Sequence, residues 1–301
     1  MASDRSIEIS RFISSLKIDN LLPLDIVKLA YLLLLRRPID PTGEASWVKQ
    51  IETDMFSIPC LIDTLQGSPE YRMVNAIPFS QMIHKARQAW IKSLPVFEEI
   101  LDIGGSSPNI AEGAMIELGY SHRPKELVIF DLPPSEQYWG NPKFPQDRDY
   151  SFSWGTLHYY HGKAEEIDQC QQLTAKTFDL VFMGQVIEHI MPNFLNKVLC
   201  WIHDHLTPNG RFIFDTPNRF ITAIQSPDSF IDQDHKLEYT PQQMEFILLK
   251  AGFSIKNRWG LIPMPNTYFT KSFNPLESYE QALLSDDLDQ CYIFSFSCGR
   301  Q

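Results

Sequence analysis

Residues 98–105 read EEILDIGG, and this stretch decides the fold class. Three apolar residues around one acid, followed by two glycines, are typical of a short buried strand that ends in a tight turn. We expect a helix to begin near Pro108, because proline fits the first turn of a helix. A strand, a glycine turn and a helix in this order favour a doubly wound α/β sheet, in which ligands bind at the carboxyl ends of the strands.

The alternation of strands and helices continues to the end of the chain. Each expected strand is a short apolar run bounded by Gly, Pro, Asn or Asp. A mixed helix is expected at 79–94 and a capped amphipathic helix in YTPQQMEFILLKAGFSI (239–255), ending at Gly252. Further strands are predicted in ELVIFDLP (126–133), before HGKAEEI (161–167), in FDLVFMGQVIEHI (178–190), in LTPNGRFIFDTPN (206–218) and in QCYIFSFSC (290–298).

Length and composition indicate a folded protein of roughly two domains. The 301 residues exceed the usual size of one domain, and 44% of them are apolar. The net charge of -11 disfavours a nucleic-acid surface, which needs clustered Lys and Arg. The five cysteines lie far apart and favour the reducing cytoplasm. The apolar run 29–35 is far shorter than the roughly 20 residues that span a bilayer, so no membrane insertion is expected.

The N-terminal part is expected to form a small all-α domain. Apolar residues recur at helical spacing over 21–37. DPTGEASWVKQI (40–51) indicates a turn and a second helix, and SPEYR (68–72) indicates a capped helix start. With its DPxGxxxW and SPEY motifs, this part resembles a small helical family of unknown function that often accompanies glycan-modifying enzymes and surface proteins. We interpret Asp40 and Glu70 as capping groups, and the domain as a docking site for a protein partner.

The chain from about residue 79 onward resembles the class I S-adenosylmethionine-dependent methyltransferase superfamily. The motifs LDIGG, FDLP, GKAEEI, FDLVFMGQVIEHI, LTPNGRFIFDTPN and LLKAGF occur in the family's order and at its spacings. The resemblance implies a Rossmann-like, mostly parallel sheet of seven strands whose last two pair antiparallel at one edge. VIEHI and TPN look most like the group of quinone-precursor and sugar O-methyltransferases. The expected domains are 1–77, helical, and 78–301, the methyltransferase domain.

The resemblance also implies a set of residues that bind S-adenosyl-L-methionine. The position of Asp131 agrees with such a role, because a carboxylate at the end of the second strand accepts hydrogen bonds from ribose hydroxyls. Asp102 and Gly104, with Gly105 beside them, would border the methionine part, Asp131 would hold the ribose, Ala164 and Glu165 would lie beside the adenine, and Gln185 would face the sulfonium.

Three residues depart from the family's pattern. Ser106 and Pro108 stand where the family usually has its second and third glycines. Lys163 stands where an acid usually bonds the adenine amino group, and a lysine cannot accept that bond. Either Glu165 replaces the acid or the backbone alone reads the adenine. The departures keep open a second interpretation, in which the chain is a non-catalytic scaffold or binding protein with a methyltransferase fold.

Two histidines are candidates for the base that removes a proton from the methyl acceptor. His189 follows the fourth strand, near the expected position of the sulfur, and an ordinary histidine pKa near 6.5 suits this role. His235 lies in DQDHKLEYT (232–240), a connection expected to cover the acceptor pocket. Both histidines also have a structural interpretation as groups that cap or staple the neighbouring helices.

A metal site is a further interpretation of the same motif. Some relatives with an ExxEH signature bind a divalent ion through glutamates and histidines. Here Gln185 replaces the first glutamate, and a neutral amide is a poor ligand for a hard cation. We therefore expect no metal ligand. A metal-assisted RNA 2′-O-methyltransferase is disfavoured by this glutamine and by the acidic composition.

The methyl acceptor is expected to be a small molecule or a glycan, methylated on oxygen. Segments 133–160 and 261–276 are rich in proline and in aromatic residues that either stack on an acceptor or pack within a lid. The aromatic candidates are Tyr138, Trp139, Trp154, Tyr159, Phe269 and Phe273. The preference for a sugar depends only on the glycan-modifying enzymes in which the N-terminal family often occurs.

Overall fold

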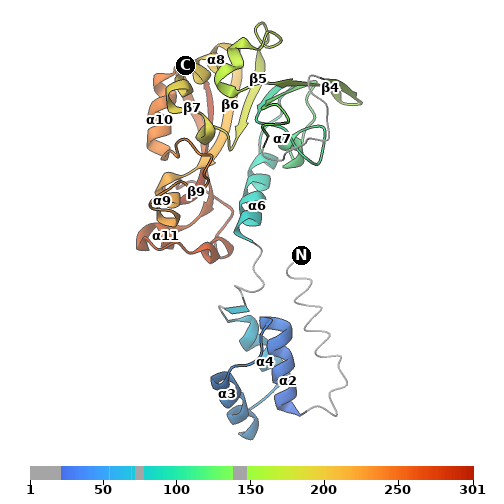
Figure 1. Ribbon diagram of the computed structural model, residues 1–301, viewed down its shortest axis with the longest axis vertical. Coiled ribbons are helices and arrows are strands. Elements are labelled where there is room, and N and C mark those ends of the chain that lie inside the picture. The colour runs from blue at the N-terminus through green and yellow to red at the C-terminus, as the bar shows by residue number, and fades with distance from the viewer. Residues whose placement is uncertain (1–21, 54, 69, 72–77, 138–147) are drawn as a thin grey trace. The chain divides into compact units, whose positions relative to one another are not determined.

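The computed structural model describes residues 22–301 except 54, 69, 72–77 and 138–147. The chain divides into two compact units, Met1–Phe79 and Ser80–Gln301, which are considered separately below (Figure 1). No described helix combines the length and apolar character that a bilayer span requires.

The described part of the first unit consists of helices. They are α2 (Pro23–Ala30), the π-helical turn η2 (Tyr31–Leu35), α3 (Pro41–Glu52) and α4 (Ile58–Gln66). Their apolar faces enclose a separate core that includes Leu34, Trp47 and Leu61. The helix predicted over 21–37 is confirmed from Pro23 to Leu35, with a change from α to π geometry inside it.

Described residues of the DPxGxxxW and SPEY stretches make structural contacts in this unit. The Asp40 side chain accepts a hydrogen bond from Gly43 N at 2.9 Å, which confirms it as the cap of α3. Buried Trp47 donates to the Tyr31 hydroxyl at 3.3 Å. Glu70 forms an ion pair with Arg37, and its role as a capping group stays a prediction.

Among the described residues of the second unit, nine strands form one mixed sheet in the order β3-β4-β2-β1-β5-β6-β9-β7-β8. The ladders from β4 through β6 are parallel, and the ladders at both ends are antiparallel. The strands are β1 (Glu99–Ile103), β2 (Glu126–Asp131), β3 (Asp149–Phe152), β4 (Gly155–His161), β5 (Phe178–Gly184), β6 (Leu206–Pro217), β7 (Phe253–Pro263), β8 (Leu284–Ser285) and β9 (Cys291–Arg300).

Helices and helical turns connect these strands. The crossovers on the two sides of β1 run in opposite directions, toward β2 and β4 and then toward β5 and β6, which is the doubly wound arrangement. The elements are α6 (Phe79–Lys92), α7 (Ala114–Glu117), η3 (Ala164–Gln169), η4 (Ile187–His189), α8 (Pro192–His205), α9 (Arg219–Gln225), α10 (Pro241–Lys250), α11 (Pro265–Thr270) and η5 (Pro275–Tyr279).

The predicted number of seven strands is wrong, because the described residues form nine. The two additional strands are the short β3 and β8, each of which adds an antiparallel edge. β3 reaches β4 through a two-residue turn at Ser153 and Trp154, so part of the expected acceptor segment is a hairpin. The expected antiparallel pairing of the last long strands is confirmed by β7 and β9.

The expected helix start at Pro108 is also wrong. The Ser107 hydroxyl accepts hydrogen bonds from Asn109 N at 3.1 Å and Ile110 N at 3.4 Å, which hold this segment in a turn. Proline also disfavours helical geometry at the residue before it. The first helix after β1 is therefore the short α7, which begins only at Ala114.

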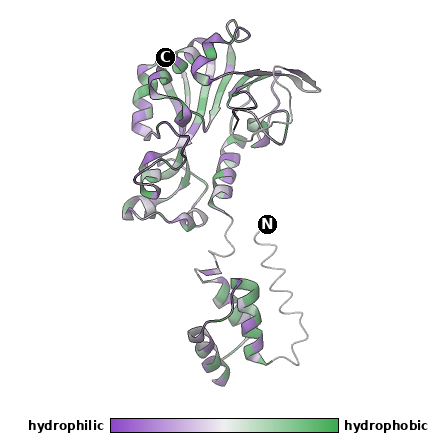
Figure 2. Ribbon diagram, in the orientation of Figure 1, coloured by the Kyte–Doolittle hydropathy of each residue, from purple (hydrophilic) through white to green (hydrophobic). Residues whose placement is uncertain are grey.

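The parallel strands are buried on both faces, which explains their continuous apolar runs. In β1, β2 and β5 nearly every residue is buried, among them Leu101, Val128 and Val181, each 0% exposed. Figure 2 shows these central strands mostly in green, the hydrophobic end of the scale. Because the interior of the sheet is apolar, the polar residues at the strand ends become the chemically informative ones.

Replacement of Thr240 by alanine is expected to lower the free energy of unfolding by about 1 kcal/mol. Thr240 and Gln243 form a reciprocal capping box at the start of α10, with bonds of 3.3 and 2.9 Å. Chemical denaturation of the full chain measures the change. Thr240→Ser keeps the hydroxyl and serves as the matched control, and equal stability of the alanine and serine variants would contradict the expectation.

Candidate active site

The predicted cofactor residues meet at one edge of the sheet. β1, β2, β4 and β5 run parallel, so their carboxyl ends lie side by side. The winding direction reverses between β1 and β5, which is where sheets of this kind bind ligands. Asp102, Gly104 and Gly105 lie at the end of β1, Asp131 ends β2, Ala164 and Glu165 follow β4, and Gln185 follows β5.

The two glycines after β1 are required by close packing. Gly104 has a φ of +74°, and a Cβ there would lie 2.4 Å from Cγ2 of Val186. A Cβ on Gly105 would lie 2.3 Å from the carboxyl carbon of Asp102. The turn therefore crosses directly over the Asp102 carboxylate and touches the residue after Gln185. This contact joins the turn after β1 to the turn after β5.

Asp102 is a buried acid at this edge. It is 1% exposed, and its Oδ2 accepts a bond from Met115 N at 3.3 Å. Burial raises the pKa of Asp102 to about 7, and the charges of Asp131 and Asp215 also raise it, against the opposing effects of Met115 N and Arg87. The Arg87 guanidinium is paired with Asp215, so the carboxylates of Asp102 and Asp131 add negative charge beyond this pair. This excess negative charge fits a ligand that carries an ammonium and a sulfonium.

Asp131 is held by the residue that departs from the glycine motif. Its Oδ2 accepts from Ser106 N at 2.9 Å, and its Oδ1 accepts from Leu132 N at 2.7 Å. Burial raises the pKa of Asp131, while these hydrogen bonds lower it. Buried Gln137 donates to Ser106 Oγ at 3.1 Å and leaves its own Oε1 without a partner among the described atoms. Ser106 therefore helps to fix the carboxylate that is predicted to hold a ribose.

Lys163 and Glu165 lie where the adenine is expected. The Lys163 ammonium is 3.9 Å from Glu136, and its side chain is 55% exposed. The Glu165 Oε1 accepts a bond from Met191 N at 3.3 Å. Glu165 therefore contacts the segment that follows His189, so the edges formed by β4 and β5 are linked. The adenine roles of Ala164 and Glu165 stay predictions.

His189 and His235 lie together. Their ring centroids are 4.8 Å apart, and the rings cross at 81°. His235 Nδ1 is 2.8 Å from Glu238 Oε1, a buried carboxylate that also accepts from Thr222 and from Ile231 N. Because the carboxylate only accepts, Nδ1 of His235 carries the proton in this pair. Its Nε2 is then the atom left for other chemistry.

The pKa values of the two histidines are shifted in opposite directions. Partial burial of the ring lowers the pKa of His189, and the neighbouring charge of His235 lowers it further. Burial alone would lower the pKa of His235, but the bond to Glu238 and the charges of Glu188 and Glu238 raise it overall. His189 is the more exposed residue. At neutral pH it is therefore an accessible, neutral imidazole beside a more basic one.

Glu188 is a buried acid next to the two histidines. It is 0% exposed, and burial raises its pKa to about 7. Its Oε2 accepts from Thr216 Oγ1 at 2.9 Å, whereas its Oε1 has no partner among the described atoms. Glu188, His189 and His235 each offer one atom that could bind a metal ion, and these three atoms lie within 4.8 Å of one another. The backbone carbonyl of Glu188 also accepts from Lys236 N at 2.7 Å, which holds the His235 segment in place.

Sequence analysis missed three residues of this edge: Arg87, Asp215 and Glu238. Asp215 lies near the carboxyl end of a parallel strand, as Asp102 and Asp131 do, so the same signal was present in FIFDTPN. Glu238 stands three positions after His235. Arg87 lies in the mixed helix α6 and forms a two-point ion pair with Asp215, at 2.7 and 3.2 Å. Nothing in the local sequence of α6 marks Arg87.

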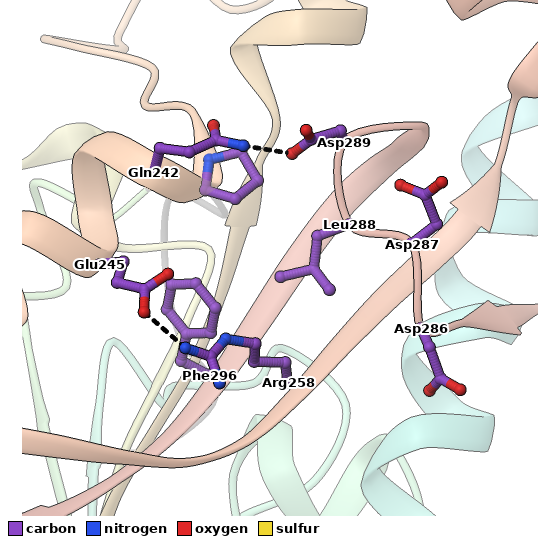
Figure 3. A pocket seen from close by; sticks show the side chains of 9 residues that line it. Gln242, Glu245, Arg258, Asp286, Asp287, Leu288, Asp289 and Phe296 are labelled. Atoms are coloured by element: carbon purple, nitrogen blue, oxygen red, sulfur yellow. Dashed lines mark hydrogen bonds and ion pairs between the residues drawn. The ribbon is translucent and has the colours of Figure 1, made fainter.

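Two hollows in the described surface involve none of the predicted site residues. One, of about 550 Å³, lies between α10 and the loop before β9, with Glu245 paired to Arg258 and Gln242 bonded to Asp289 (Figure 3). The other, of about 470 Å³, is lined by Arg219 and Phe230, among others. Arg219 contacts Glu238 at 3.3 Å, so this second hollow adjoins the support of His235.

The described aromatic residues that were expected around the acceptor lie in different surroundings. Tyr159 is 4% exposed and belongs to the core. Trp154 stacks on Phe152 in the hairpin, with centroids 5.0 Å apart. Phe269 is 71% exposed on α11, and Phe273 packs near Tyr292. Tyr138 and Trp139 lie outside the described residues, and the acceptor role of the others stays a prediction.

A known protein family matches the part of the chain that contains the candidate site. A family described as "Methyltransferase domain" matches residues 79–257, more than half of the chain. The chain belongs to this methyltransferase family. The match covers the strands that carry Asp102, Asp131 and Gln185, and both histidines. The methyltransferase domain therefore contains the whole candidate site, while residues 1–78 lie outside the match.

Solved methyltransferase structures are similar to the matched part of the chain at low sequence identity. An S-adenosylmethionine-dependent methyltransferase from Thermotoga maritima, described as a possible histamine N-methyltransferase, has 14% identity and a TM-score of 0.50, over 74% of this chain and 91% of its own. One from Archaeoglobus fulgidus has 16% identity and a TM-score of 0.48, over 73% and 94%. The small RNA methyltransferase HEN1 has 15% identity and a TM-score of 0.46 over 74% of this chain, which spans only 25% of HEN1. Curated protein sequences gave no significant match.

Proposed function

We propose that the methyltransferase domain transfers a methyl group from S-adenosyl-L-methionine to a hydroxyl of a small molecule or glycan. The observation that carries this proposal is the position of a neutral, accessible imidazole beside the cofactor edge. His189 N bonds to Val186 O at 2.9 Å, and Val186 is the residue that packs against Gly104. Val186 therefore connects the predicted base, His189, to the glycine turn that is predicted to bind the cofactor.

Different residues at this edge bind different parts of the cofactor in this proposal. The carboxylate of Asp131 is oriented for the ribose, and the charge excess around Asp102 suits the methionine ammonium. When bound, the cofactor supplies a methyl group already activated by a sulfonium. The protein then needs only to align the acceptor and accept its proton, which His189 does in its neutral form.

Asp131→Ala is expected to weaken binding of S-adenosyl-L-methionine and of S-adenosylhomocysteine by about 10- to 100-fold, because two charge-assisted bonds to the ribose are lost. Isothermal titration calorimetry on the full chain measures both affinities. Asp168→Ala is the matched control, because Asp168 is an exposed acid that pairs with Lys197. Unchanged affinity of the Asp131 variant would remove its ribose role. Failure of the wild type to bind either nucleoside would instead support a non-catalytic scaffold.

A second candidate is metal-assisted methyl transfer, favoured by the cluster of Glu188, His189 and His235. Sequence analysis predicted no metal because of Gln185, yet the structure gathers two imidazoles and one carboxylate, and the Oε1 of Glu188 is unpartnered. Glu238 behind His235 is the support that metal-binding histidines usually have. Such a set of donors suits Zn²⁺, Mn²⁺ or Fe²⁺ better than Mg²⁺. A bound ion there would polarise the acceptor hydroxyl.

Metal titration separates the two mechanisms. Chelator-treated protein that retains full activity supports the base mechanism. Activity that is lost and returns only with a divalent ion supports the metal mechanism, as does calorimetric binding of the ion that Glu188→Gln abolishes. For the helical N-terminal unit, we propose that it docks a protein partner.

A further inference from the structure

The side chain of Gln185 is held in one orientation by a buried network. Its Nε2 donates to Asp215 Oδ2 at 2.8 Å, and its backbone N donates to Asp215 O at 2.9 Å. Asp215 is 0% exposed. Because a carboxylate only accepts hydrogen bonds, it must face the amide nitrogen of Gln185 and not the oxygen. The orientation of the amide is therefore fixed by chemistry.

Arg87 makes this network electrically neutral. Its guanidinium donates to both carboxylate oxygens of Asp215, at 2.7 and 3.2 Å, and its side chain is only 16% exposed. A Cβ on Gly184 would lie 2.5 Å from Nη2 of Arg87, so only glycine at this position admits the guanidinium. The charge of Asp215 is thus balanced within the protein. What remains for a ligand is the dipole of the Gln185 amide.

Strand order decides which side the Gln185 oxygen faces. β5 lies between β1 and β6, and Asp215 is on β6, paired in register with Gly184. The nitrogen of the planar amide points toward β6, so the oxygen points away from it. Gln185 has a φ of +59°, an unusual value for a residue other than glycine, and the two bonds to Asp215 hold it there. The Oε1 has no hydrogen-bond partner among the described residues.

We propose that Arg87 and Asp215 are positioning residues that present the carbonyl oxygen of Gln185 to the cofactor, and that this oxygen selects the charged sulfonium over the neutral thioether left after methyl transfer. This inference rests on the proposed function. The partial negative charge of the oxygen attracts a cation and gains nothing from an uncharged sulfur. The network therefore favours the substrate form of the cofactor over the product form, which promotes release of the product.

The test compares the affinities of the full chain for S-adenosyl-L-methionine and S-adenosylhomocysteine by calorimetry, with chelator present so that no metal contributes. Gln185→Met keeps the length of the side chain and the Arg87–Asp215 pair but removes the oxygen. We expect the ratio of the two dissociation constants to shift about tenfold against S-adenosyl-L-methionine, with little change for S-adenosylhomocysteine. Gln242→Met, on the exposed side of α10, is the matched control and leaves the ratio unchanged.

Asp215→Asn tests the orientation itself. Arg87 Nε and Gln185 Nε2 both donate to Oδ2 of Asp215, so the asparagine oxygen is expected at that position and its new amide nitrogen then opposes Nη2 of Arg87, which also donates. The support of the Gln185 amide is therefore weakened while its partner atom is kept. The selectivity is expected to fall part of the way toward that of Gln185→Met, and the double variant is expected to fall no further than Gln185→Met. A circular dichroism spectrum and melting curve establish that each variant is folded. Equal changes in both affinities, or no change in either, overturn the inference while leaving the proposed function intact. Absence of binding to the wild type overturns both.

Discussion

His189→Ala is expected to slow methyl transfer by about 10²- to 10⁴-fold, the usual contribution of a general base. The imidazole of His189 is accessible, and its pKa lies below the ordinary histidine value because of partial burial and the neighbouring charge of His235. The wild-type rate should rise with pH as His189 loses its proton and reach a plateau near neutrality. The variant should lose this limb of the profile. Single-turnover rates over pH 5 to 9 measure both effects.

Matched variants separate a base from a structural residue. His84→Ala removes an exposed histidine of α6 that contacts Gln88, and should leave rate and pH profile unchanged. Added imidazole should partly restore His189→Ala if the residue is a base. Recovery with excess divalent ion but not with imidazole would assign His189 to metal binding instead. If His189→Ala keeps the full rate on a neutral hydroxyl acceptor, His189 is neither the base nor a metal ligand.

The central parallel strands could be predicted because their apolar runs are long and each ends in Asp or Gly or is followed by Gly. β1, β2 and β5 were placed correctly from such runs, and the antiparallel β9 was placed from its apolar run alone. β3 and β8 escaped prediction because they are short and partly exposed, so neither burial nor length produces a pattern. The helix expected at Pro108 failed because the Ser107 hydroxyl competes for the backbone there, which is a local contact that periodicity does not record.

The candidate site could be predicted only where its residues follow strands directly. Asp102, Asp131 and Gln185 carry that signal, and the sheet brings them to one edge. Arg87 could not be found in this way, because it reaches Asp215 across 128 positions of sequence and only after α6 has packed on the sheet. The proximity of His189 to His235 likewise depends on the loop that Glu188 holds through its backbone carbonyl. Long-range contacts of this kind have no local trace in the sequence.

Asp102→Asn is expected to make the ligand-free protein more stable above pH 7, by on the order of 4 kcal/mol at most. Burial raises the pKa of Asp102 from 3.8 to about 7. Between these values the folded state holds a proton that the unfolded state releases, so wild-type stability falls as pH rises from about 4 to about 7 and then levels off. The amide cannot ionise, and its oxygen still accepts from Met115 N. Urea denaturation at several pH values measures the difference, which should vanish near pH 4.

The same acid should couple cofactor binding to pH. A cation beside Asp102 favours the ionised carboxylate, so binding of S-adenosyl-L-methionine should release a proton near pH 6 and strengthen as pH rises through 7. In Asp102→Asn this dependence should disappear and the affinity should stay low throughout. Calorimetry in buffers of different ionisation enthalpy counts the released protons directly. A wild type whose affinity does not change between pH 6 and 8 would show that Asp102 serves only to hold α7 beneath the glycine turn. In that case the stability difference above pH 7 should still be observed, because it depends on burial and not on the ligand.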